Sequence, residues 1–205
     1  MLNPNPIHPE TPALPAAALD QLFREARTHN VFQNRPVPEA LLREAVELTK
    51  MGPTSANALP MRVVFATSAD AKAKLKPALL GANVDKTMAA PTTAIVGYDV
   101  KFFEHYPRLF PHADAKVWYV GNEAFAQDTA YKNATLQTGY FILALRALGL
   151  DTGPMTGFNP AAVDEAFFKG TSVKSNILIN IGYGDAEKLF PRSPRLNFEE
   201  IASFA

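Results

Sequence analysis

The stretch Gly52-Pro53-Thr54-Ser55-Ala56-Asn57-Ala58-Leu59-Pro60 separates two regular patterns. Residues 38–50 carry apolar side chains at helical spacing, and residues 61–67 are rich in the β-branched and aromatic residues of a strand. Glycine and proline indicate a fixed, irregular backbone between them. The hydroxyl and amide side chains offer hydrogen-bond donors and acceptors without net charge. From these residues alone two interpretations stay open: a plain turn, or a loop that wraps a flat polar ring.

Composition excludes several classes of protein. The 205 residues fit one domain of ordinary size. Lys+Arg and Asp+Glu both number 20, so the usual electrostatic argument for nucleic-acid binding is missing. The absence of cysteine excludes disulfides, thiolate metal sites and cysteine nucleophiles. No basic-then-apolar leader opens the sequence, and no apolar run approaches the ~20 residues that span a bilayer. We therefore expect a cytoplasmic protein with no membrane partner.

The hydrophobic pattern predicts one domain over residues 16–205, preceded by a proline-rich arm over residues 1–15. We expect helices over 16–27, 38–50, 68–75, 123–148 and 161–168, and strands over 61–67, 92–98 and 175–183. The segment 99–120 is rich in aromatic residues, and we expect it to be an irregular excursion between a strand and a helix that packs against the domain. His105, His112 and Asp114 lie in it, but their spacing matches no helical ligand pair, and we expect no metal site.

Three further places carry side chains with two possible interpretations. Arg27-Thr28-His29-Asn30 follows the first helix, as a basic helix end or as an anion site. Lys86 is a solvated loop charge or a fixed cation. Arg192 and Arg195 in the tail either serve solubility or bind phosphate. Arginine suits a phosphate because it presents several donors in a fixed fork.

Pro53-Thr54-Ser55-x-Asn57-x-x-Pro60 resembles the flavin-binding loop P-S-x-x-N-x-Q-P-W of the nitroreductase family, with Leu59 in place of Gln and Met61 in place of Trp. The segments Arg27–Asn30, Leu150–Phe158 and Phe190–Ile201 resemble further flavin segments of that family, in the same order. Counted back from Phe32, Arg27 lies one place from the family's first arginine, so the register of this segment stays open. Thr156 stands where the family usually has Glu.

The resemblance implies a cofactor, FMN, and roles for the residues that would bind it. Asn83 and Lys86 would face the pyrimidine edge of the ring, where a fixed cation stabilises the reduced anion. The segment Arg27–Asn30 and the tail would hold the phosphate of FMN. The loop of residues 53–60 would contact the rest of the ring, together with the backbone near N5, the atom that accepts hydride. The cofactor residues implied are Arg27, Thr28, His29, Pro53, Thr54, Ser55, Asn57, Asn83, Lys86, Pro154, Met155, Thr156, Gly157, Arg192 and Arg195.

The same resemblance implies an α+β fold: a central mixed sheet flanked by helices, in a homodimer with FMN at the subunit interface and a C-terminal extension that embraces the partner. NADPH or NADH would deliver hydride to the flavin and leave before the second substrate enters, and the sequence does not choose between the two nucleotides. No catalytic side chain is expected beyond Thr156 and Gly157 near N5, and the proton donor is equally open between water and a side chain.

Several stretches are similar to the malonic semialdehyde reductases of pyrimidine breakdown. They are Arg-Thr-His-Asn, Gly-Pro-Thr-Ser-Ala-Asn, Leu-Phe-Pro-His-x-Asp-Ala, Gly-Leu-Asp-Thr-Gly-Pro-Met and Asn-Ile-Gly-Tyr-Gly-Asp. This similarity implies reduction of 3-oxopropanoate to 3-hydroxypropanoate, and Arg108 is a candidate for the substrate carboxylate. The alternatives are a broad nitroaromatic or quinone reductase, and a flavin-binding dimer without catalysis, which the residues Leu59 and Thr156 keep open.

Overall fold

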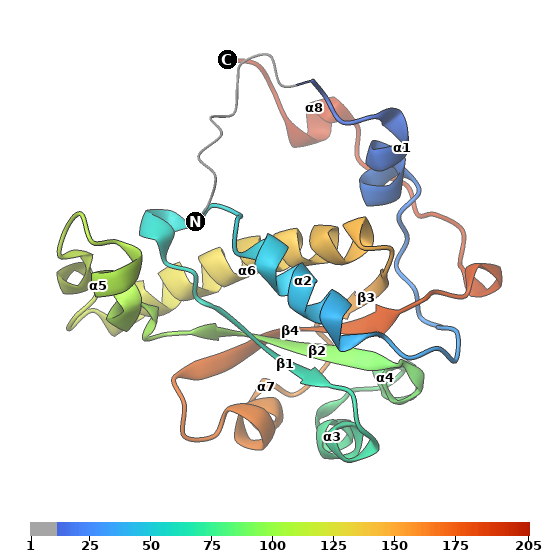
Figure 1. Cartoon of the computed structure of the whole chain (residues 1–205), viewed down its shortest axis with the longest axis horizontal. Helices are drawn as coiled ribbons and strands as arrows, with labels where there is room; N and C mark the ends of the chain where they lie inside the picture. The colour runs from blue at the N-terminus through green and yellow to red at the C-terminus, as the bar shows by residue number, and fades with distance from the viewer. Residues whose placement is uncertain (1–11) are drawn as a thin grey trace.

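The computed structural model describes residues 12–205 and shows a sheet covered by helices on both faces (Figure 1). Most of the proline-rich arm expected over residues 1–15 lies outside the described residues. In chain order the elements are α1 (Ala16–Leu19), η1 (Asp20–Arg24), α2 (Glu39–Thr49), η2 (Ser55–Asn57), β1 (Met61–Ala66), α3 (Ala69–Leu75), η3 (Lys76–Ala78), α4 (Asn83–Ala89), β2 (Thr92–Asp99), η4 (Phe102–His105), α5 (Tyr106–Leu109), η5 (Ala115–Trp118), α6 (Glu123–Ala147), β3 (Asp151–Met155), α7 (Pro160–Val163), η6 (Asp164–Phe168), β4 (Val173–Gly182), η7 (Ala186–Lys188) and α8 (Phe198–Ile201).

The four strands lie in the order β1-β2-β4-β3, and each neighbouring pair is antiparallel. The expected α+β class, with helices flanking a central sheet, is confirmed. We expected a mixed sheet; among residues 12–205 the parallel pairing is the isolated bridge between Thr28 and Thr152, at the β3 edge. β1 forms the opposite edge of the sheet.

Alternate residues of the central strands enter two separate cores, because successive side chains point to opposite faces of a sheet. Ala94, Val96 and Ile179 pack with α2 and α6 on one face. Ile95 and Leu178 pack with α3, α7 and η6 on the other. A third cluster joins the aromatic excursion over residues 99–120 to the first half of α6.

Two local differences from the expected elements affect the site. The first helix ends at Arg24, short of the expected Arg27, because the chain must become extended for Thr28 to bridge to Thr152. The stretch Asn83–Ala89, expected to be a loop, forms the helix α4. The Ser68 side chain caps α3, since it accepts a hydrogen bond from the Ala71 N–H.

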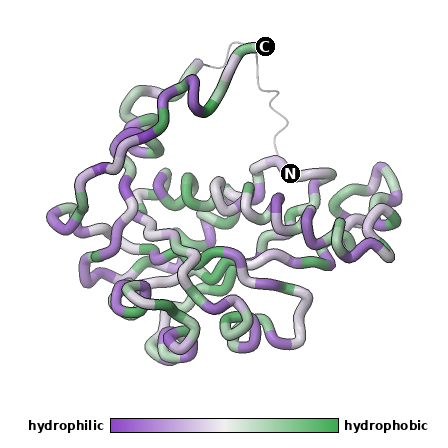
Figure 2. Tube along the Cα trace, turned by 180° about the vertical axis from the view of Figure 1, so that it is seen from behind, coloured by the Kyte–Doolittle hydropathy of each residue, from purple (hydrophilic) through white to green (hydrophobic). Residues whose placement is uncertain are grey.

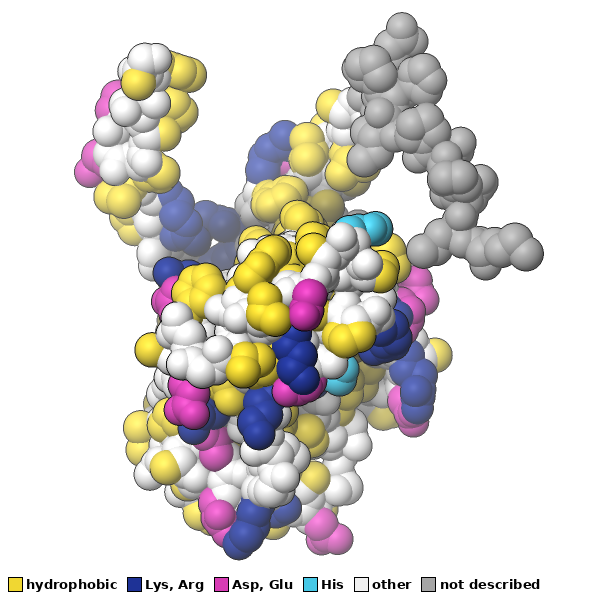
Figure 3. All heavy atoms as spheres, turned by 90° about the vertical axis from the view of Figure 1, so that its left-hand side faces the viewer, with side chains coloured by type: hydrophobic (Ala, Val, Ile, Leu, Met, Phe, Trp, Pro, Cys, Tyr) yellow, Lys and Arg dark blue, Asp and Glu magenta, His cyan; other side chains and the backbone are white. Residues whose placement is uncertain are grey.

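Apolar side chains remain exposed on α6 and on the C-terminal arm. The stretch over residues 140–148 at the end of α6 is apolar nearly all round, yet Tyr140 in it is exposed, as is Leu136 one turn earlier. The arm carries the exposed side chains of Leu196, Phe198 and Ile201 and stands away from the body (Figures 1 and 3). In Figure 2 the green apolar stretches accordingly lie both along the central strands and in the arm. Among residues 12–205, no helix has the length and apolar character needed to cross a membrane.

Candidate functional site

The segment Arg27–Asn30 is fixed along the outer edge of β3. The His29 N–H donates to the Thr152 carbonyl at 3.0 Å. Two glycines make the close approach possible: a Cβ on Gly153 would lie 2.4 Å from the His29 carbonyl oxygen, and a Cβ on Gly184 would lie 2.1 Å from the His29 Nδ1. Only residues without a side chain fit at these two positions.

His29 itself points into the protein. Its side chain is buried, its Nε2 lies 3.5 Å from a carboxylate oxygen of Asp151, and its Nδ1 has no hydrogen-bond partner in the described part of the chain. The geometry therefore gives the His29 side chain a packing role behind the segment, while Arg27 and Asn30 are partly exposed and Thr28 is exposed.

Three arginines from distant parts of the sequence meet at one hollow. A cavity of about 210 Å³ is lined by Arg27, Thr28 and Asn30 on one side and by Arg192, Arg195 and their neighbours in the tail on the other. No carboxylate is among the lining residues, so the hollow is a candidate anion site. The Arg192 Nη2 donates to the Arg24 and Ala26 carbonyls at 2.7 and 3.1 Å, and Arg27 donates to the Phe190 carbonyl. Since each guanidinium has five donors, others remain for an anion.

The helix α4 brings Asn83 and Lys86, which were predicted to face the flavin ring, to the same region. The Asn83 Nδ2 donates to the Gly157 carbonyl at 2.8 Å, and a Cβ on Gly157 would lie 2.3 Å from that nitrogen. The Lys86 Nζ donates to the Asn30 Oδ1 at 3.4 Å. The structure thus joins Asn83, Lys86, Gly157 and the arginine hollow into one basic region, the α4 half-site. Asn30 belongs to the predicted segment Arg27–Asn30, but it was not among the individual cofactor residues that the resemblance implied.

Not every predicted side chain of this region is turned outward. Met155 is buried with the core residues of α3 and α7, and the Thr87 hydroxyl donates to its sulfur at 3.5 Å. Thr156 is exposed, and Pro154 and Gly157 are partly exposed. Any contact from Met155 to a ligand would therefore come from its backbone.

The loop of residues 53–60 packs against α6 and α5 instead. The Ser55 N–H donates to the Asn133 Oδ1 at 2.8 Å, and the Asn57 Nδ2 donates to the Leu109 carbonyl at 2.9 Å. Three residues other than glycine, Ala56, Asn57 and Leu59, have φ values of 46°, 53° and 43°. Such left-handed backbone is unfavourable for L-residues, so surrounding contacts must hold this shape. The fixed irregular backbone predicted here is confirmed.

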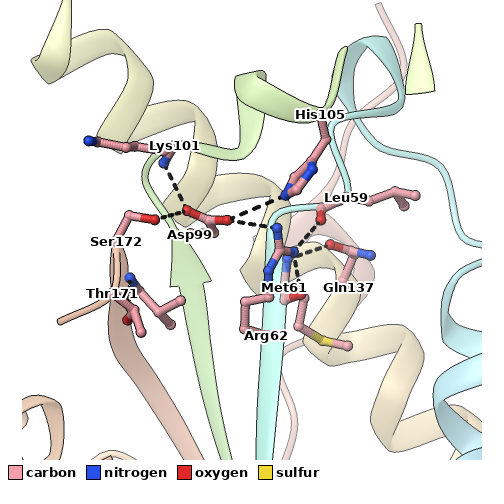
Figure 4. A network of polar contacts seen from close by, with 10 residues as sticks. Leu59, Met61, Arg62, Asp99, Lys101, His105, Gln137, Thr171 and Ser172 are labelled. Atoms are coloured by element: carbon pink, nitrogen blue, oxygen red, sulfur yellow. Dashed lines mark hydrogen bonds and ion pairs between the residues drawn. The ribbon is translucent and has the colours of Figure 1, made fainter. Parts of the chain in front are cut away.

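A polar network fastens the end of this loop to the sheet (Figure 4). The Arg62 Nη1 donates to the Leu59 and Met61 carbonyls, each at 2.9 Å, and its Nη2 donates to the Asp99 Oδ2 at 2.7 Å. Asp99 also accepts from the Lys101 N–H at 2.9 Å and from the Ser172 hydroxyl at 2.6 Å. The network was not predicted, because its members are scattered and show no motif.

The loop 53–60 and the α4 half-site lie at opposite ends of the sheet. The loop leads into Met61, which pairs with Tyr98, whereas α4 leads into Thr92 at the other end of β2. The length of β2 separates them by about 23 Å. One chain therefore gathers the predicted residues into two half-sites and does not bring them together.

The aromatic excursion borders the loop half-site. Phe102, Tyr106 and Tyr119 are buried there, with the Phe102 and Tyr119 ring centroids 5.0 Å apart, and burial raises the pKa of Tyr106. Arg108 is exposed on α5, one residue before the carbonyl that Asn57 binds. The structure therefore places the candidate substrate residue next to the loop.

The family model named Nitroreductase family matches residues 23–183. The chain belongs to the nitroreductase family. A protein of Burkholderia lata, provisionally named NADH dehydrogenase/NAD(P)H nitroreductase, is 61% identical over 91% of this chain and 95% of its own. One of Stenotrophomonas maltophilia with the same provisional name is 61% identical over 94% and 98%.

Solved structures of nitroreductases have the same fold. One from Bacillus subtilis, provisionally described as a nitroreductase, superposes with a TM-score of 0.83 at 25% identity and covers 92% of this chain and 99% of its own. Another from Exiguobacterium sibiricum, solved in complex with FMN, has a TM-score of 0.78 at 21% identity, over 90% and 96%. These likenesses confirm the expected nitroreductase-like fold.

Proposed function

We propose that this nitroreductase is an FMN-dependent NAD(P)H oxidoreductase. The observation that carries the proposal is the α4 half-site, where three arginines at a hollow free of carboxylates adjoin Lys86, Asn83 and Gly157. This donor set fits FMN, which has a dianionic phosphate at one end and a polar ring at the other. The provisional names of the relatives and the FMN complex of the Exiguobacterium sibiricum protein support the same assignment.

The residues of the half-site have different roles, which follow from their chemistry. Arg27, Arg192 and Arg195 hold the phosphate through charge-assisted hydrogen bonds. Lys86 places a fixed positive charge where negative charge develops on the ring, and the Asn83 amide can donate and accept there. The bound FMN supplies hydride transfer, from NAD(P)H to the acceptor. Gly157 lets backbone approach the ring closely.

The site is completed in a homodimer. Because the loop half-site lies about 23 Å from the α4 half-site within one chain, a second copy must supply Ser55 and Asn57 to the ring that Lys86 faces. A two-fold interface repeats this exchange and forms two equal sites. The exposed apolar side chains of Tyr140, Phe198 and Ile201 could be buried in such an interface.

The dimer is tested by analytical ultracentrifugation of the protein and of the double variant Phe198→Ser, Ile201→Ser. We expect a dimer in both proteins, with a higher dissociation constant in the variant. The circular dichroism should be unchanged, because these side chains belong to none of the core clusters of their own chain. A monomer at all concentrations in the unaltered protein would contradict the proposed completion of the site.

For the acceptor we propose malonic semialdehyde, reduced to 3-hydroxypropanoate, with Arg108 beside the loop as the carboxylate partner. The observation that favours the second candidate, a broad nitroaromatic or quinone reductase, is the nitroreductase name of the relatives. Turnover of malonic semialdehyde, menadione and a nitroaromatic by Arg108→Gln separates them. If the carboxylate is held, KM rises for the semialdehyde alone; equal effects on all three acceptors would remove Arg108 from this role.

The experiment that tests the proposal as a whole is the absorption spectrum of the purified protein during anaerobic addition of NADPH. We expect a flavin spectrum that bleaches and recovers on adding the acceptor. Lys86→Gln should lose about tenfold to a hundredfold in the rate of bleaching, since it removes one fixed charge from the site. Lys169→Gln, a change of an exposed lysine that pairs with Glu165, is the matched control. A flavin that NADPH does not bleach would favour the non-catalytic flavin-binding dimer.

A further inference from the structure

The lysine at position 72 is almost fully enclosed. It lies on α3, is 5% exposed, and makes no ion pair with any described residue. Its ammonium group donates three hydrogen bonds: to the Thr87 carbonyl at 2.7 Å, to the Ala90 carbonyl at 3.0 Å and to the Thr93 hydroxyl at 2.6 Å. An ammonium has three donors, so all of them are used. A lysine is rarely buried in this way without a carboxylate partner.

Two of the three acceptors are at the C-terminal end of α4. A helix leaves its last carbonyls without backbone partners, and a cation there is favourable. The Thr87 carbonyl would normally receive the N–H of residue 91, but residue 91 is a proline and has none. The Lys72 ammonium supplies the missing donor. It thus fastens the end of the helix whose earlier turns carry Asn83 and Lys86.

The third acceptor begins a buried hydrogen-bond chain that returns to the same helix. The Thr93 hydroxyl donates to the Asn180 Oδ1 at 2.8 Å, and the Asn180 Nδ2 donates to the Thr87 hydroxyl at 3.3 Å. The Thr87 hydroxyl in turn meets the sulfur of Met155 at 3.5 Å. Lys72 is therefore connected, through β2 and β4, to the strand that leads into Gly157.

We propose that Lys72 is a positioning residue for the cofactor half-site: by holding the C-terminal carbonyls of α4, its ammonium group sets where Asn83 and Lys86 stand. The inference rests on the proposed function in that these two residues face FMN. Lys72 itself touches neither the arginine hollow nor the exposed part of α4.

The network requires the charged form of the amine. A neutral amine has two donors, and a carbonyl cannot donate in return, so deprotonation leaves either an α4 carbonyl or the Thr93–Asn180 link without its bond. Burial lowers the pKa of Lys72 to about 8. Other charged groups of the surrounding elements do not compensate: Asp70, Lys74 and Asp85 are exposed on α3 and α4, Lys86 bonds to Asn30, and Asp99 and Lys174 lie at the far ends of β2 and β4.

The first test uses the protein without FMN, so that it does not depend on the proposed function. The methyl resonance of Met155, assigned by its loss in Met155→Leu, is followed by NMR from pH 6.5 to pH 9.5. We expect a shift with its midpoint near pH 8 in the unaltered protein and in Lys76→Met, and no such shift in Lys72→Met. Lys76 is exposed and neighbours the same helix, which makes it the matched control. A Met155 resonance that does not move in the unaltered protein would overturn the proposal even if Lys72→Met failed to fold.

The second test measures placement. Hydrogen exchange of the amides of residues 83–89 should become faster in Lys72→Met than in Lys76→Met. The dissociation constant for FMN at pH 7 should rise about tenfold, by analogy with metal sites that lose a residue supporting a ligand. Unchanged exchange and unchanged FMN affinity would overturn the proposal. If no variant binds FMN but exchange in α4 still responds, the proposed function fails while the positioning role of Lys72 stands.

Discussion

Replacing Gly153 by alanine tests how the segment Arg27–Asn30 is held in place. The added Cβ would lie 2.4 Å from the His29 carbonyl oxygen, a backbone atom that cannot rotate away. Real Cβ contacts essentially never fall below 3.0 Å. The segment must therefore move outward by about 0.6 Å, as overpacked groups do.

The magnitude follows from what that movement disturbs. Overpacking a closed site costs about 1–3 kcal/mol. The hydrogen bond from the His29 N–H to the Thr152 carbonyl lies between buried residues, and its loss costs about 1 kcal/mol more. We expect the free energy of unfolding to fall by about 2–4 kcal/mol. Because Arg27 moves with the segment, the dissociation constant for FMN should rise about tenfold, which corresponds to 1.4 kcal/mol.

The assay is urea unfolding followed by circular dichroism at a fixed protein concentration, with a fluorescence titration of FMN in parallel. The control is Gly149→Ala, where φ is +77° and nothing lies within 4 Å of the new Cβ. That change should cost about 1–2 kcal/mol through the left-handed backbone and leave FMN affinity unchanged. A Gly153→Ala protein with the stability and FMN affinity of the unaltered chain would refute the reasoning.

Three further predictions concern stability. Phe141 is fully buried between α6 and the sheet, so Phe141→Ala should cost about 3–5 kcal/mol in urea unfolding, and a loss below 1 kcal/mol would contradict its core position. Asp99→Ala leaves the Arg62 guanidinium without its carboxylate, so we expect a loss of about 2 kcal/mol and faster proteolysis within residues 53–60; cleavage at the unaltered rate would count against the network. Lys72 has a pKa of about 8 when folded and about 10.4 when unfolded, so the unfolded chain binds more protons between these values. The unfolding free energy of the unaltered protein minus that of Lys72→Met should therefore rise by about 2.5 kcal/mol from pH 8 to pH 10.4, and a flat difference would disprove the buried ammonium.

The sequence predicted the main helices and strands because their apolar periodicity is strong. It missed α4, because the stretch from Asn83 to Ala89 offers only Val84 and Met88 as an apolar stripe, and because Lys72, distant in sequence, bonds the carbonyls at the end of the helix. It also extended the first helix to Arg27, because nothing local shows that Thr28 pairs with Thr152. In both places a contact distant in sequence decides the local structure.

The members of the site were easier to predict than their arrangement. The resemblance selected Arg27, Asn83, Lys86, Gly157 and Arg192, and the structure gathers these residues into one region. The supporting residues Arg62, Asp99 and Lys72 carry no motif, since a buried partner is defined only by the fold. Linear order likewise does not reveal that the loop 53–60 lies at the other end of the sheet.

The separation of the two half-sites has a genetic consequence. In the proposed two-fold dimer, a chain altered at Asn57 and a chain altered at Lys86 would each form inactive homodimers, because both sites of each contain the lesion. Paired with one another, they place both lesions in the same site and leave the second site intact. Two null alleles co-expressed in one cell should then restore up to half of the activity per mixed dimer. Mutations in this gene would fall into two complementation groups, divided by which end of the sheet they occupy.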